Sequence, residues 1–185
     1  HEIEVHYQPI MSLLSREVAG FEALARWKHP TRGLLQPSEF IGMAEQAGMI
    51  REIGDMVLVE AVRQMGIWQR VLTRNRPVFM AINVSSDQLS DTSFLDRLNS
   101  VIAREGVLPY AIKIEITESV AMRYPERARQ LIQRLISLGI GVACDDFGTG
   151  FSNLSSLREL AFDTLKIDRS FITGDGLQSR GGVIL

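Results

Sequence analysis

Hard oxygen donors stand at the ends of several apolar, strand-like segments of this chain. The donors are Glu22, Asn83, Glu115, Asp145 and Asp146. If these segments are parallel strands of one sheet or barrel, their carboxyl ends converge on a single site. Carboxylates that meet there would repel one another unless a cation lay between them, and oxygen ligands favour Mg²⁺ or Mn²⁺ over Zn²⁺. The pattern therefore predicts a centre for a divalent metal ion.

The adjacent aspartates Asp145 and Asp146 suggest a more specific chemistry. Neighbouring strand residues point to opposite sides, but where a strand turns into a loop both side chains can reach one site. One carboxylate can then bridge two ions about 3.5–4 Å apart, an arrangement that serves phosphodiester hydrolysis. Lys166 could orient the attacking water or stabilise charge on the phosphorane. Arg26, four residues after Glu22, is suited to clamp a phosphate.

Several other chemistries do not fit the sequence. The string "DFG" also occurs in protein kinases, but no HRD-like loop, glycine-rich turn or VAIK-like lysine precedes it. None of the three histidines stands at the end of a predicted strand, as a zinc hydrolase barrel would require. The single cysteine, Cys144, lies in an apolar run and is expected to be a small buried hydrophobe in a reducing compartment.

Composition adds few constraints on partners. The chain has 185 residues, 45% hydrophobic and 23% charged, with a net charge of −2, which is typical of a globular domain. No cluster of Lys and Arg indicates a nucleic-acid polymer or an anionic membrane as partner. No apolar run approaches the roughly 20 residues that cross a bilayer.

The elements that position these residues alternate between strand and helix patterns, which is typical of repeated βα units. Strands are expected at 3–10, 18–27, 78–85, 111–119, 140–146 and 162–168, and helices at 38–48, 54–70, 93–106, 125–139 and 153–160. The first two strands should form a hairpin that turns near Ser15 and Arg16, so the first strand is antiparallel. The best fit is a (β/α) barrel, with a doubly wound open sheet as the alternative.

A closed eight-stranded barrel usually takes about 250 residues, and only six strands are expected here. The sequence therefore predicts one domain over residues 1–185 whose last βα units are missing at the C-terminus. It also predicts that the chain is a piece of something longer, because it starts almost inside a strand and without a methionine.

Seven strings of the sequence closely resemble the EAL domain family, which is named for the residues here numbered Glu22-Ala23-Leu24. They are "YQPI", "GFEALARWKHP", "PSEFI", "INVS", "KIEITES", "DDFGTGFSNLSSL" and "LKIDRSFI", in the family's order. The resemblance implies a TIM-like barrel with one antiparallel strand. It also implies a phosphodiesterase that linearises cyclic di-GMP to pGpG with Mg²⁺ or Mn²⁺.

The resemblance assigns roles residue by residue. It implies that Glu22, Asn83, Glu115 and Asp145 bind one metal, that Asp145 bridges to a second, and that Asp146 binds the second. It places Lys166 beside the nucleophilic water, Gln8, Arg26 and Asp168 on the substrate, and Leu24 on the substrate through its backbone. Glu118 resembles the glutamate that anchors the loop from Phe147 to Ser152, which the family connects with dimerisation.

The family's later motifs, an EGVE-like strand, a following glutamine and a GYLF-like segment, are not found before Leu185. An EGVE-like strand, whose first glutamate binds the second metal in the family, does not appear, so the second ion's site is expected to be incomplete in this chain. A binding-only receptor for cyclic di-GMP stays open as an alternative function, as does another Mg²⁺-dependent barrel enzyme. The expected partners are cyclic di-GMP, a second copy of the chain in a homodimer, and a sensory or GGDEF domain in the parent protein. The domain is expected in the cytoplasm, and attachment of the parent protein to a membrane stays open.

Overall fold

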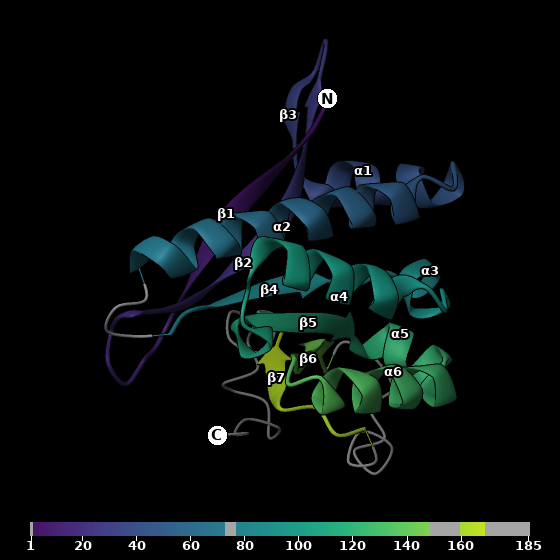
Figure 1. Cartoon of the computed structure of the whole chain (residues 1–185). Coiled ribbons are helices and arrows are strands. Elements are labelled where there is room, and N and C mark those ends of the chain that lie inside the picture. Colours follow the sequence, from purple (N-terminus) through teal and green to yellow (C-terminus); the bar gives the residue numbers. More distant parts are fainter. Residues whose placement is uncertain (1, 73–76, 149–159, 169–185) are drawn as a thin grey trace, which may run out of the picture.

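The computed structural model of the chain describes residues 2–72, 77–148 and 160–168. Seven strands form one sheet, and helices cover one side of it (Figure 1). In chain order the elements are β1 (Ile3–Met11), β2 (Val18–His29), β3 (Gly33–Leu35), α1 (Pro37–Gln46), α2 (Ile50–Leu72), β4 (Phe79–Asn83), α3 (Ser86–Leu89), α4 (Phe94–Glu105), η1 (Pro109–Ala111), β5 (Ile112–Thr117), α5 (Glu118–Arg123), α6 (Pro125–Ser137), β6 (Gly141–Phe147) and β7 (Thr164–Ile167).

The strand order distinguishes between the two folds that the sequence allowed. The strands follow one another as β1-β2-β4-β5-β6-β7, with β3 paired to the end of β2. β1 runs antiparallel to β2, and each later pair along this path is parallel. A doubly wound sheet would reverse its strand order at a switch point. The sequential order is that of a (β/α) barrel with an antiparallel first strand, as predicted.

The β1–β2 hairpin turns where the sequence indicated. Ser12 and Arg16 close the turn through the hydrogen bonds Ser12 N–H to Glu17 O (2.8 Å) and Arg16 N–H to Ser12 O (2.8 Å). Arg16 has a φ of 56°, in the left-handed region that a tight turn requires. The turn therefore fixes β1 antiparallel to β2 and places Gln8 opposite Glu22.

Strand β5 shows how the sheet separates core from site. Ile112, Ile114 and Ile116 are completely buried in the core between sheet and helices. Because side chains alternate across a strand, Glu115 projects to the other face. The apolar residues of the strands thus pack against the helices, and their polar neighbours project from the inner face of the curved sheet.

Helices α1, α2, α4 and α6 agree with the predicted patterns to within two residues at each end, apart from the start of α2. In α6 the buried positions are Ala128, Leu131, Ile132 and Leu135, and Gly139 follows with a φ of 77°, as a C-terminal glycine should. Helix α2 begins at Ile50, four residues before the predicted start at Gly54. A Cβ on Gly54 would lie 2.5 Å from Oε1 of Gln88, so this glycine permits close packing of α2 against α3 and does not mark a helix end.

The sequence patterns missed the short elements β3, α3, η1 and α5, which have three to six residues each. The helix expected at 153–160 lies almost wholly outside the described residues. Within the ranges that the structure describes, every helix is too short or too polar to span a lipid bilayer.

Candidate metal centre

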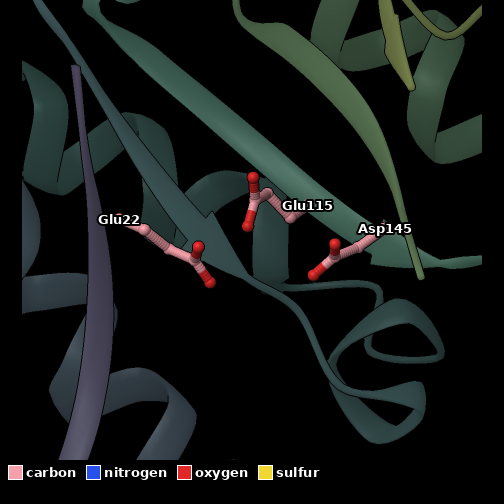
Figure 2. Close-up of side chains that lie close together, drawn as sticks. All are labelled: Glu22, Glu115 and Asp145. Carbon is pink, nitrogen blue, oxygen red and sulfur yellow. The ribbon is translucent and has the colours of Figure 1, made fainter. Parts of the chain in front are cut away.

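Three carboxylates from three strands meet on the inner face of the sheet. Glu22 of β2, Glu115 of β5 and Asp145 of β6 each offer an oxygen atom, and these atoms lie within 4.8 Å of one another. Figure 2 shows the three side chains converging on one space from their separate strands. The structure therefore brings together three of the predicted metal ligands in a group that could hold a metal ion.

Lys166 of β7 lies in the middle of this group. Its Nζ is 2.6 Å from Oε2 of Glu115, 3.1 Å from Oε2 of Glu22 and 3.2 Å from Oδ2 of Asp145. Burial alone would lower the pKa of Lys166, but Glu115, Glu22 and Asp145 outweigh it and raise the pKa. The ammonium therefore stays charged and neutralises part of the acidic group.

Glu115 is the most enclosed of the three acids, with 1% of its side chain exposed. Burial raises its pKa to about 7, and the charges of Glu22 and Asp145 act in the same direction, while Lys166 opposes them. Three carboxylates against one ammonium leave a formal excess of two negative charges. A divalent cation with hard oxygen ligands matches that excess, so the donor set fits the metal that the sequence predicted.

A β-bulge explains why two aspartates are adjacent. Cys144 pairs with Leu165 and Phe147 with Ile167, so Asp145 and Asp146 both stand opposite Lys166. One extra residue on the bulged strand redirects its side chains, and Asp146 has a φ of 52°. The sequence placed this change of direction at the end of the strand, whereas it occurs within β6.

Asp146 lies at the border of the acidic group. It is not one of the three clustered acids, but its backbone N–H donates to Oδ1 of Asp145 at 3.0 Å. Burial raises the pKa of the Asp146 carboxyl, and the charges of Asp145 and Asp168 add to that effect. Asp146 is thus close enough to interact with the group electrostatically, and its predicted role at a second ion stays a prediction.

Asn83 supports the group from β4. Its Nδ2 donates to Oε1 of Glu22 at 2.9 Å, and its backbone is paired with Glu115. With the amide nitrogen on Glu22, the amide oxygen is the atom of Asn83 that could coordinate a cation.

The predicted substrate residues line the strands beside the three carboxylates. Leu24 and Arg26 follow Glu22 at intervals of two residues and so share its face of β2. Arg26 donates from Nη1 to the carbonyl of Ala25 at 2.8 Å and forms no ion pair with any residue in the described ranges. Its positive charge is therefore available to an anion.

Two further predicted substrate residues frame the group. Gln8 of β1 is exposed and stands directly opposite Glu22. Asp168 follows β7, where its backbone N–H donates to the carbonyl of Phe147 at 3.4 Å. These contacts put Gln8 and Asp168 on the strands at either side of the carboxylate group.

Glu118 has the position expected of a loop anchor. It is the first residue of α5 and only 1% exposed, and its Oε2 accepts a hydrogen bond from the N–H of Gly148 at 2.7 Å. Thr117 caps the helix by accepting from the N–H of Val120, which fixes the start of α5 beside β6. Most of the loop that Glu118 is expected to anchor, from 149 onward, lies outside the described residues.

Two features of the site had no signal in the sequence. One is the hydrogen bond from the backbone amide of Gly148 to Glu118. The other is the bulge that places Lys166 opposite both aspartates. Both depend on how the strands pair. The dipeptide Thr117-Glu118 did carry a usable signal, because threonine before a glutamate is a common helix start.

Comparison with known families gives one match over nearly the whole chain. The model of the EAL domain matches residues 1–184. An uncharacterised signalling protein of Caulobacter vibrioides is 42% identical over 172 residues, covering 93% of this chain and 20% of that protein. The cyclic di-GMP phosphodiesterase NbdA of Pseudomonas aeruginosa is 40% identical over 171 residues, covering 92% of this chain and 22% of that protein.

Solved structures give the same result. The phosphodiesterase PaMucR in complex with c-di-GMP has a TM-score of 0.86 and 37% identity, over 92% of this chain and 68% of that one. MucR of Pseudomonas aeruginosa is a bifunctional diguanylate cyclase and cyclic di-GMP phosphodiesterase. The present chain spans about a fifth of the length of the first curated relatives that it matches.

Proposed function

The chain belongs to the EAL domain family, and we propose that it is a metal-dependent phosphodiesterase that hydrolyses cyclic di-GMP to linear pGpG. The observation that carries the proposal is the convergence of Glu22, Glu115 and Asp145 around Lys166. A binding-only receptor has no need of this concentration of charge around a buried carboxylate. The cyclic di-GMP phosphodiesterase activity of relatives such as NbdA supports the choice of substrate.

The proposed metal site comprises Glu22, Asn83, Glu115 and Asp145, with Asp146 on a second ion. A bound Mg²⁺ or Mn²⁺ pair would supply a nucleophilic water and charge neutralisation at the phosphate. Glu115 and Glu22 would hold the site in place, because each contacts Lys166 and Glu22 also accepts from Asn83.

The other residues bind the substrate and stabilise charge in this proposal. Arg26 clamps a non-bridging phosphate oxygen, and Gln8, Asp168 and the backbone of Leu24 orient the dinucleotide. Lys166 donates a hydrogen bond to the water that adds to phosphorus, and stabilises the negative charge that develops there. The water forms one new P–O bond as the P–O3′ bond breaks, which gives the linear product.

Glu118 and the relatives' domain composition also bear on the assembly of the chain and on its neighbouring domains. Glu118 would tie the loop after β6 to the site and to a homodimer interface. Because MucR combines a diguanylate cyclase with a phosphodiesterase, we propose a sensory or GGDEF domain as the neighbour of this domain in a cytoplasmic parent, with or without a membrane anchor.

The direct test is incubation of the purified full EAL domain that includes this chain with cyclic di-GMP and Mg²⁺ or Mn²⁺, with product analysis by liquid chromatography. We expect pGpG to accumulate, and EDTA to abolish its formation. Circular dichroism should show that EDTA leaves the fold intact. Binding of cyclic di-GMP without turnover, by folded protein saturated with metal, would favour the receptor function instead.

A further inference from the structure

A hollow of about 630 Å³ lies between α6 and the segment that joins α3 to α4. Figure 1 shows α3, α4 and α6 as neighbouring helices outside the sheet. The hollow shares no residue with the candidate metal centre and plays no part in the proposed hydrolysis. Its volume is within the roughly 300–1,000 Å³ that ligand sites in proteins occupy.

The hollow has an excess of positive charge. Arg127 and Arg134 of α6 line it, and Asp91 is the one acidic residue among the described residues that line it. The carboxylate of Asp91 is already paired, with Arg97 at 2.6 Å and Arg51 at 2.8 Å. Its negative charge is therefore not available to the two arginines of α6.

The two arginines are themselves not neutralised. Arg127 donates from Nη1 to Oγ of Ser90 at 2.7 Å, which is a neutral partner. Arg134 forms no ion pair with any residue in the part of the chain that the structure describes. Both guanidinium groups can therefore donate hydrogen bonds to an anionic ligand.

Apolar side chains lie between the two charges. Leu131 stands four residues after Arg127 and three before Arg134, so the arginines lie two helical turns, about 10 Å, apart on one face with the leucine between them. Leu89 and Leu95 line the hollow on the side opposite α6. All three leucines are less than 10% exposed. None of the described lining residues is aromatic, which disfavours a nucleobase as ligand.

We propose that the hollow binds an extended acidic peptide of a partner protein, with the pattern Glu-x-Leu-x-Glu. Alternate residues of an extended strand share one face, and its outer glutamates would lie about 13 Å apart, within reach of both arginine side chains. The central leucine would contact Leu131.

The test measures binding of a fluorescein-labelled peptide, Ser-Glu-Gly-Leu-Gly-Glu-Ser, to the full chain by fluorescence anisotropy. We expect saturable binding that Arg134→Glu weakens by about tenfold or more, because a charge-assisted hydrogen bond is lost and a repulsion gained. Arg70→Glu is the matched control, since Arg70 is exposed on α2, does not line the hollow and changes the net charge equally. Circular dichroism of each variant establishes that it is folded.

A second peptide with both glutamates replaced by lysine should bind Arg134→Glu better than it binds the unchanged chain. Three results would overturn the proposal: no saturable binding to the unchanged chain, equal loss in Arg134→Glu and Arg70→Glu, or equal binding of a scrambled peptide of the same charge. Analytical ultracentrifugation adds a fourth. If the chain self-associates and Arg134→Glu dissociates it, the occupant is a second copy of the chain and the proposal is wrong.

Discussion

At the scale of single residues, Glu115 combines near-complete burial with three charged neighbours, and its protonation should control metal binding. Because its pKa is raised to about 7, the carboxyl is largely protonated at pH 6 in the metal-free protein and ionised at pH 8. A cation must displace that proton before it binds. We expect Mn²⁺ affinity to be about tenfold weaker at pH 6 than at pH 8, because each pH unit below the pKa costs up to about tenfold.

Isothermal titration calorimetry at the two pH values checks this expectation, and buffers of different ionisation enthalpy count the protons released. Glu115→Gln removes the titrating group, so its weaker binding should vary much less between pH 6 and pH 8. Equal affinities at both pH values for the unchanged chain, without proton release, would show that Glu115 does not couple to the metal.

A substitution at Asp146 can separate an effect on catalysis from an effect on the fold. Asparagine adopts a left-handed backbone readily, so Asp146→Asn should keep the bulge and the φ of 52° while removing a negative charge from the proposed second ion. We expect hydrolysis of cyclic di-GMP to fall by at least about a hundredfold, with an unchanged circular dichroism spectrum. Asp96→Asn, the same change at an exposed position of α4, is the control.

A normal rate for Asp146→Asn would contradict the two-ion assignment while leaving the first metal site in place.

Residue types and strand ends were sufficient to select Glu22, Asn83, Glu115, Asp145 and Lys166 as one group. They could not give the bulge opposite Lys166, because register between strands is set by pairing across the sheet.

At the scale of elements, an ion-pair network joins α2 to the start of α4. Asp91 lies 2.6 Å from Arg97 of α4 and 2.8 Å from Arg51 of α2, and Arg97 also reaches Asp55 at 3.2 Å. Burial acts to raise the pKa of Asp91, but the N–H and hydroxyl of Ser93 together with Arg97 lower it to about 2. This network therefore stabilises the packing of α2 against α4.

Asp91→Asn should reduce the free energy of unfolding by about 1–3 kcal/mol at pH 7, since a largely buried carboxylate loses its ion pairs with Arg97 and Arg51. The folded pKa lies below the ordinary value of 3.8, so the contribution is complete above about pH 4 and is lost as the pH falls towards about 2. The difference between the two proteins should shrink over that range. Urea titrations at pH 7 and pH 3 measure it.

Asp96→Asn provides the matched carboxylate-to-amide control on α4, and its effect should be several-fold smaller. If Asp91→Asn were no less stable at pH 7, the ion pairs would contribute nothing to the contact between α2 and α4.

Long elements were predictable and short ones were not, for a physical reason. Helix α6 repeats its buried positions over about two turns and β5 alternates its isoleucines, so each pattern outweighs local propensity. In contrast, α3 depends on Gln88, which bonds Asp55 at 3.1 Å, and β3 depends on pairing with β2. Pairing with a distant segment determines β3, whereas α3 combines such a contact with one local signal, the capping box formed by Ser85 and Gln88.

At the scale of the whole molecule, the site joins the two ends of the described sheet. Gln8 and Glu22 come from β1 and β2, whereas Asp145 and Lys166 come from β6 and β7, and β1 and β7 are the outer strands of the order. A ligand that contacts both sides should therefore stabilise the entire sheet and not one element alone.

This linkage gives a test of substrate class that does not depend on turnover. In the Asp146→Asn variant with Mg²⁺, cyclic di-GMP at about a hundredfold excess over its Kd should add about 2.7 kcal/mol. For a domain of this size that corresponds to a rise in Tm of about 5–10 °C, measurable by differential scanning fluorimetry. Arg26→Ala in the same background should bring the rise close to zero, because the phosphate loses its clamp. At equal ligand concentrations, a larger rise with sugar phosphates or dicarboxylic acids than with cyclic di-GMP would instead identify another Mg²⁺-dependent barrel chemistry, because the stabilisation increases with the logarithm of the ligand concentration divided by its Kd.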